Sequence, residues 1–245
     1  FRMFLHFPDN HFGCITSMDR EFGRLMACLE EEGLAEDTIV LLTADHGEML
    51  GIHGRWMKNI WYEESIGVPF ILRWPGRIPA GRREDCLINT PDVMPTLLGL
   101  MGVACPAGRD GLDLSATLCG AAGPRPACAF LSFCTGAPPP HKTRWEFPVE
   151  TGMYWRGLRD RRYTYACVDQ RPSSIYYDDR RRDAFPPHAT RVLFDNEADP
   201  WQLRPLYPGA DGDADAVMDG LHARLAAWLD SQGDPFLRDY WSSTR

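Results

Sequence analysis

Apolar and polar positions in the first forty residues follow two different periods. Between residues 16 and 32, apolar side chains recur every three or four positions, which is the spacing of one helix face; they are Met18, Phe22, Leu25, Met26 and Leu29. Gly33 can take the left-handed conformation that ends such a helix. The near-continuous apolar run from Thr38 to Leu42 then predicts a strand covered on both faces.

Strands and helices are expected to alternate up to about residue 120. We expect strands over 1–7 and 68–74, the second stopped by Pro75-Gly76. A helix is expected from Thr90, its cap, to about Gly102, with Pro91 at the first helical position. This alternation predicts an α/β fold with a mostly parallel sheet flanked by helices.

The composition of the chain changes near residue 120. Residues 121–142 are rich in Pro, Gly and Ala, which predicts a loop or linker. After it we expect an antiparallel hairpin formed by residues 152–158 and 163–168, followed by an exposed Arg-rich loop over 173–190. A short strand over 192–194 and a terminal amphipathic helix over 217–229 complete the chain. We therefore expect two domains, an α/β domain over 1–120 and a small α+β subdomain over 121–245.

Charge and composition exclude some classes of protein. The net charge of −8 argues against non-specific binding to nucleic acid. A run of about 18 apolar residues is missing, so no membrane-spanning helix is expected, and no secretory signal is recognisable. The chain opens on Phe1-Arg2-Met3-Phe4-Leu5, which reads like the inside of a strand and favours an N-terminal truncation. Localisation and oligomeric state stay open.

The cysteines give no clear sign of a metal centre or of the redox compartment. There are 8 of them, and no pair has the C-x-x-C spacing of a structural zinc site. Cys14 and Cys28 fall on or near the apolar side of the expected helix, where free buried thiols are ordinary.

Residues 43–58, directly after the apolar strand, carry the densest candidate chemistry. Asp45 and His46 can place one oxygen and one nitrogen on a shared divalent ion if the chain turns there, and Gly47 permits a turn. An oxygen-bound divalent ion needs about six donors, so other ligands must come from elsewhere. Lys58 can bind an anionic oxygen as a compact charge. A metal and a lysine together would stabilise a tetrahedral sulfate or phosphate in a transition state.

Each of these residues also has an ordinary interpretation. Asp-His-Gly is a common tripeptide, His53 could be a hydrogen-bonded loop residue, and Lys58 could be a solvated surface lysine. Only the order of strand, Asp-His-Gly, Gly-x-His-Gly and Lys favours a site.

This order resembles the second signature region of the type I sulfatases, in the alkaline-phosphatase superfamily. The similarity extends over most of the chain, through segments that begin at Met18, Gly33, Glu63, Asp92, Trp155 and Leu193. The resemblance implies that Asp45 and His46 ligate a metal, usually calcium. It also implies that Lys58 contacts the sulfate and the leaving oxygen, and that His53 lies near the pocket.

The family also has an N-terminal half that we do not find in this chain. In it, two adjacent aspartates complete the metal site, and a Cys-x-Pro/Ala-x-Arg motif supplies a formylglycine nucleophile. Residues 105–109 match that motif, but they follow the Asp-His-Gly strand instead of preceding it, so we reject them. The family also has a histidine, usually as His-x-Pro, after a strand like 1–7. His6 and His11 are the candidates, neither in that context, and the loop that would carry the histidine looks shortened or missing, so His11 is kept only as a candidate.

These features predict a sulfuric ester hydrolase acting on a small-molecule or carbohydrate sulfate ester, here as an incomplete chain. One alternative is a phosphonate or phosphate monoester hydrolase of the same superfamily, because the same metal and lysine suit phosphoryl oxygens. The other is a catalytically inactive sulfatase-like domain.

Overall fold

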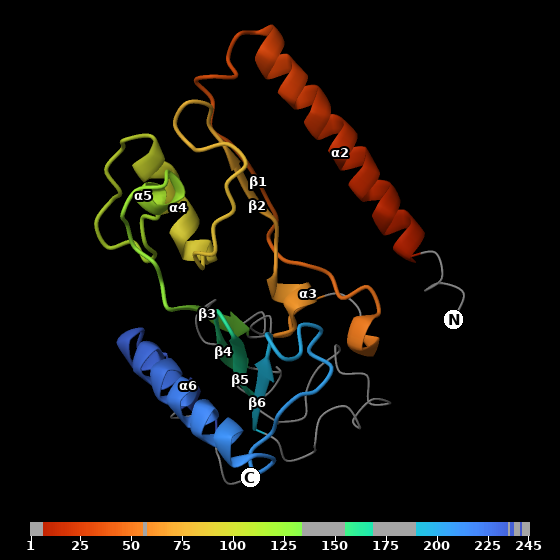
Figure 1. The fold of residues 1–245 in the computed structure, drawn as a ribbon, viewed down its shortest axis with the longest axis vertical. Helices are drawn as coiled ribbons and strands as arrows, with labels where there is room; N and C mark the ends of the chain where they lie inside the picture. The colour runs from red at the N-terminus through yellow and green to blue at the C-terminus, as the bar shows by residue number, and fades with distance from the viewer. Residues whose placement is uncertain are drawn as a thin grey trace, which may run out of the picture. The chain divides into compact units, whose positions relative to one another are not determined.

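The protein divides into two compact units (Figure 1). The computed structural model describes residues 7–55, 58–133, 155–168, 190–234, 236–237 and 241. The first unit comprises Phe1–Lys58, Gly67–Cys86 and Pro91–Arg125, and the second comprises Asn59–Ile66, Leu87–Thr90 and Pro126–Arg245. The expected division into two domains at residue 120 stays a prediction.

A long helix, α2 (Phe7–Glu31), begins the described part of the first unit. It starts nine residues before the expected position, inside the segment expected to be a strand, of which residues 1–6 lie outside the described part. Pro8 does not prevent this start, because the first turn of a helix has no use for the missing N–H. The helix ends as predicted at Gly33, which has a φ of 66°, and the N–H of Leu34 closes the end on the carbonyl of Leu29 at 2.9 Å.

Much of the apolar face of α2 is exposed. Phe12, Met18 and Leu25 are 58, 67 and 54% exposed. The two thiols expected to be buried, Cys14 and Cys28, are also exposed, so that expectation was wrong. The helical period identified the apolar face, but burial depends on what packs against it.

The first unit contains a two-stranded antiparallel sheet of β1 (Val40–Thr43) and β2 (Phe70–Arg73). The described residues include no parallel pair, so the predicted parallel sheet is not confirmed. A parallel pair needs a long crossover, usually a helix. In the described part of the connection from β1 to β2, the helices are the short η1 (Ile52–Gly54) and α3 (Glu63–Ile66).

Two further helices, α4 (Thr90–Leu100) and α5 (Ser115–Leu118), follow the sheet in the chain. Helix α4 begins at Thr90, which was predicted to cap it, one residue before the predicted first helical residue, and it ends two residues before the predicted Gly102. Its buried Asp92 accepts a hydrogen bond from the N–H of Leu112 at 2.8 Å. This contact secures the returning loop to the first turn of α4.

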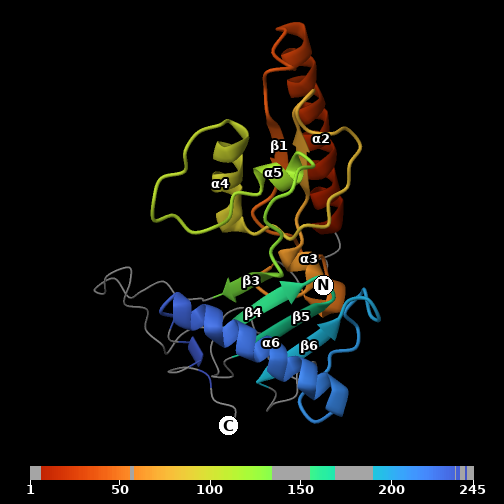
Figure 2. The ribbon, with the colours of Figure 1, turned by 60° about the vertical axis from the view of Figure 1, so that its left-hand side comes forward.

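The second unit is built on a four-stranded antiparallel sheet in the order β3-β4-β5-β6 (Figure 2). The strands are β3 (Cys128–Phe133), β4 (Trp155–Asp160), β5 (Tyr163–Val168) and β6 (Arg191–Asp195). The predicted hairpin is confirmed as β4 and β5. Strand β3 lies inside the stretch expected to be a loop, because its six residues are flanked by the Pro, Gly and Ala that dominate the local composition.

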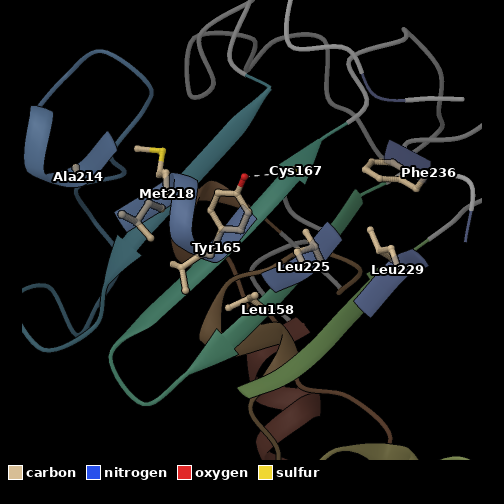
Figure 3. Close-up of a cluster of buried hydrophobic side chains, with 10 residues drawn as sticks. Leu158, Tyr165, Cys167, Ala214, Met218, Leu225, Leu229 and Phe236 are labelled. Carbon is tan, nitrogen blue, oxygen red and sulfur yellow. Dashed lines mark hydrogen bonds between the residues drawn. The ribbon is translucent and has the colours of Figure 1, made fainter. Parts of the chain in front are cut away.

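Helix α6 (Gly212–Ser231) covers one face of this sheet (Figure 2). Its N-cap, Asp211, accepts the N–H of Asp213 at 3.1 Å. The apolar stripe predicted from the sequence packs on the sheet residues (Figure 3); the buried cluster includes Leu158, Tyr165, Cys167, Met218, Leu221, Leu225 and Leu229. None of the described helices has the length and apolarity to cross a membrane.

Candidate active site

Strand β1 ends at Thr43, and the chain turns away at Asp45 and His46, as the sequence predicted. The side chain of Asp45 is 84% exposed and that of His46 is 37% exposed. The Oδ1 atom of Asp45 accepts the backbone N–H of His46 at 3.0 Å. This contact folds the carboxylate back toward the imidazole ring that follows it.

The hydrogen bonds of His46 define which of its ring nitrogens carries a proton. Nδ1 lies 2.8 Å from the carbonyl oxygen of Gly47. A carbonyl oxygen can only accept, so Nδ1 must donate, and in a neutral imidazole Nε2 then presents a lone pair. This Nε2 faces Oδ2 of Asp45 at 3.3 Å. In that tautomer both atoms present lone pairs, which are what a shared cation would bind.

The spacing of these two atoms fits a shared divalent ion. Ligands at about 2.1–2.4 Å from an ion and at a right angle to each other lie about 3.1 Å apart. The observed separation of 3.3 Å is close to that value. In the described part of the chain, however, no cluster of three His, Cys, Asp or Glu residues could hold a metal. The role of this pair as metal ligands stays a prediction.

The loop after His46 is compact and strained. Met49 is fully buried and accepts the N–H of Ile52 at 2.8 Å, while Gly51 donates to the carbonyl of Arg55 at 2.7 Å. Leu50 and His53 have φ values of 47° and 51°, in the left-handed region that side chains other than glycine rarely adopt. Strain of this kind costs about 1–3 kcal/mol and concentrates at functional loops.

The structure does not join the other candidate residues to this pair. His53 is half-buried within η1, and Lys58 is half-buried after two residues that lie outside the described part. Among the described residues, no hydrogen bond or ion pair links Lys58 to Asp45 or His46. His11 lies in the second turn of α2, with its ring against Phe12 at 6.1 Å, and its role in a site stays a prediction.

The rejected Cys-x-Pro/Ala-x-Arg match lies in a loop after α4. Cys105 is exposed, and Gly108 has a φ of 73°. This is the loop that the sequence predicted there. The sequence did not reveal the role of the segment after Lys58: Asn59 has a φ of 78° and its carbonyl binds the indole of Trp155. The one local sign in the sequence was the asparagine itself, because asparagine tolerates the left-handed conformation better than most residues.

Comparison with known proteins gives consistent matches. The Sulfatase family model matches residues 5–103. The ulvan-active sulfatase of Formosa agariphila is 31% identical over 237 residues, which are 95% of this chain and 41% of that protein. The chain thus spans less than half the length of this curated relative.

Solved structures agree with the sequence matches. The yidJ protein of Bacteroides fragilis, which carries a sulfatase assignment, superposes with a TM-score of 0.72 at 28% identity, over 93% of this chain and 43% of that one. The phosphonate monoester hydrolase of Agrobacterium radiobacter superposes with a TM-score of 0.68 at 26% identity, over 90% of this chain and 40% of that one. Together with the signature order that places Asp45 and His46 directly after β1, these matches show that the chain is similar to sulfatases, with the Sulfatase family model matching residues 5–103.

Proposed function

We propose that this chain carries the metal-binding and anion-binding residues of a sulfuric ester hydrolase. The observation that carries the proposal is the pair of acceptor atoms, Asp45 Oδ2 and His46 Nε2, that face each other at 3.3 Å just after a β-strand. A hydrogen-bonded carboxylate and an imidazole with a fixed tautomer are a suitable ligand pair. The similarity to sulfatases suggests the reaction that this pair would serve.

Each residue has a proposed part in the reaction. Asp45 and His46 hold a divalent metal, which we take to be calcium as in the family. When bound, such an ion polarises the sulfate oxygens and offsets the charge that develops on them. Lys58 donates hydrogen bonds to the sulfate and to the leaving oxygen, and His53 lines the same pocket. His11 stays a prediction without an assigned step.

The complete reaction needs more than these residues. The family nucleophile, a formylglycine made from cysteine, has no counterpart in a fitting place in this sequence, and two acidic metal ligands are also expected from the family. An alkaline-phosphatase-like, mostly parallel sheet would likewise need strands beyond the described ones. The substrate we propose is a carbohydrate or small-molecule sulfate ester, because the relative from Formosa agariphila is named for activity on ulvan.

Calorimetry with calcium tests the metal site directly. Because the ligand set is incomplete, we expect weak calcium binding to the wild-type chain and none to Asp45→Ala or His46→Ala. The matched control is Asp37→Ala, because Asp37 is an exposed carboxylate just before β1 where Asp45 is one just after it. Calcium affinity that is the same in Asp45→Ala as in the wild type would contradict the proposed ligands.

Hydrolysis assays distinguish the reaction classes. With the N-terminal half of a sulfatase restored and 4-nitrophenyl sulfate as substrate, Lys58→Ala should lower the rate while Lys142→Ala, which removes the one other lysine in the sequence, should not. An unchanged rate in Lys58→Ala would count against the assigned role. Preference for a phenyl phosphonate ester over the sulfate would favour the alternative enzyme, which the structural match to a phosphonate monoester hydrolase supports. Calcium binding without hydrolysis of either ester would favour an inactive domain.

A further inference from the structure

The segment directly after Lys58 is buried far more deeply than the candidate site residues. Ile60, Trp61 and Tyr62 are 4, 3 and 8% exposed, whereas Asp45 and His46 are exposed or half-buried. Lys58 is the last residue of its stretch of the first unit, and Asn59 is the first residue of the second unit. One peptide bond therefore connects the proposed catalytic lysine to a hydrophobic core.

A side chain distant in sequence fixes the first residue of this buried segment. Trp155, on β4 and 3% exposed, donates its indole Nε1–H to the carbonyl oxygen of Asn59 at 3.0 Å. Asn59 has a φ of 78°, a left-handed conformation that asparagine tolerates better than most residues. The hydrogen bond and the left-handed conformation together define the direction in which the chain leaves Lys58.

The next residues lock the segment onto the same sheet. The ring of Trp61 meets that of Trp155 edge-on, with centroids 5.7 Å apart, and Tyr62 packs on Phe194 of β6 at 5.5 Å. The N–H of Glu63 then donates to Oε1 of the buried Gln202 at 2.8 Å. The segment is held at both ends and in its middle, so it has little freedom to shift.

We propose that Trp155 and Asn59 are positioning residues for Lys58. This inference rests on the proposed function of Lys58. A lysine side chain is long and flexible, so its charge is placed accurately only if its main chain is fixed. Fixing one reacting group in advance is a recognised source of rate enhancement.

The small number of lysines in the chain allows the main chain of Lys58 to be observed directly by NMR. Among 26 basic residues only Lys58 and Lys142 are lysines, and the other 24 are arginines. Labelling with ¹⁵N-lysine therefore gives two backbone amide signals, and Lys142→Arg identifies the one from Lys58. Relaxation measurements on that signal report the order of the Lys58 main chain without any need for activity.

Trp155→Phe removes the indole donor and keeps an aromatic ring in the core. We expect the order parameter of the Lys58 amide to fall from about 0.85 in the wild type to below about 0.6 in this variant. The matched control is Trp228→Phe, a tryptophan of the same unit that stacks on Phe130 at 4.4 Å and should leave the Lys58 signal unchanged. A low order parameter in the wild type, or an unchanged one in a folded Trp155→Phe, would overturn the proposal.

A second variant covers the case in which Trp155→Phe fails to fold. Asn59→Gly leaves every side chain of the core in place, and glycine adopts a φ of 78° without strain. Because glycine also has many other conformations open to it, this variant should lower the Lys58 order parameter while the far-UV circular dichroism stays that of the wild type. A Lys58 signal as ordered as in the wild type would contradict the positioning role.

Titration with inorganic sulfate separates this inference from the proposed function. The Lys58 amide of the wild type should shift with sulfate, and Trp155→Phe should need about tenfold more sulfate for half the shift, which Trp228→Phe should not. If sulfate does not shift the Lys58 amide signal of the wild type, the proposed function is contradicted. The order parameters of that amide still decide whether Trp155 holds the Lys58 main chain in place. A sulfate affinity that Trp155→Phe does not change would contradict the positioning role.

Discussion

Gln202 offers a substitution that changes hydrogen bonding without changing shape. It is 1% exposed, and its Oε1 accepts the N–H of Glu63 at 2.8 Å. Its Nε2 donates to Oδ1 of Asn196 at 2.8 Å and to Oγ1 of Thr164 at 3.3 Å. Gln202→Glu keeps the bond to Glu63 and turns the donor into an acceptor that faces Asn196.

The cost follows from which neighbours can adapt. The hydroxyl of Thr164 can rotate to donate, so its contact is not counted as lost. Asn196 cannot flip freely, because its Nδ2 already donates to the carbonyl of Arg162 at 2.9 Å. Leaving a buried acceptor unsatisfied costs about 1–3 kcal/mol, and burial of the new carboxylate adds about 1.4 kcal/mol for each unit by which its pKa rises. We expect a total loss of about 2–4 kcal/mol at pH 7.

The loss should depend on pH in a defined direction. When the carboxyl group introduced by Gln202→Glu is protonated, it can donate to Asn196, so the folded state favours the neutral carboxyl and its pKa rises above the unfolded value of about 4.3. The folded variant then binds more protons than the unfolded chain, so its stability falls as pH increases through this window. The difference from the wild type should therefore be smaller at pH 4.5 than at pH 7.

Urea unfolding at the two pH values, followed by tryptophan fluorescence, measures this difference. Gln232→Glu is the matched control, because Gln232 is an exposed glutamine at the end of α6. An added negative charge at a helix C-terminus should cost no more than about 1 kcal/mol. If Gln202→Glu unfolded within about 0.5 kcal/mol of the wild type at pH 7, or lost the same stability at both pH values, the hydrogen-bond assignment would be refuted.

Three further predictions concern packing and charge. Leu225→Ala, at a fully buried position, should lower the free energy of unfolding by about 2–5 kcal/mol in urea titrations. Burial, aided by the charge of Arg191, lowers the pKa of His222 below 6.5. The unfolded chain therefore binds more protons than the folded one below pH 6.5, so stability should fall as the pH decreases, and His222→Gln should remove this contribution to the pH dependence. Hydrogen bonding from Arg125 lowers the pKa of Glu84 to about 2; Arg125→Gln should raise that pKa toward 4.5 in an NMR titration, and the stabilising effect of the pair should be present above pH 4.5 and lost as pH falls toward 2.

The sequence predicted elements whose signal is local. The glycine stop at Gly33 and the apolar stripe of α6 each depend on residues within a few turns, and both lie where expected; α4 begins within one residue of its predicted start. The direction of strand pairing is not local, which explains why the parallel arrangement expected for β1 has no support in the described residues. The start of α2 was misjudged because the apolar residues before it suit a strand as well as a helix.

The candidate site shows the same limit. The order of residues after β1 was enough to select Asp45 and His46, because the two are adjacent and share one turn. It could not show that Nδ1 of His46 donates to Gly47, which leaves Nε2 facing the carboxylate. The contact between Trp155 and Asn59 spans 96 residues, and no spacing rule connects positions so far apart.

The outer edge of β1 has a practical consequence. In the described part of the chain β1 pairs with β2 alone, so its other side presents main-chain donors and acceptors on which a further strand can grow. Its apolar side chains make such stacking favourable, so the protein should be concentrated slowly and kept cold, and light scattering against concentration is the appropriate quality check before any calorimetry. A peptide that caps this edge would serve as a stabilising additive.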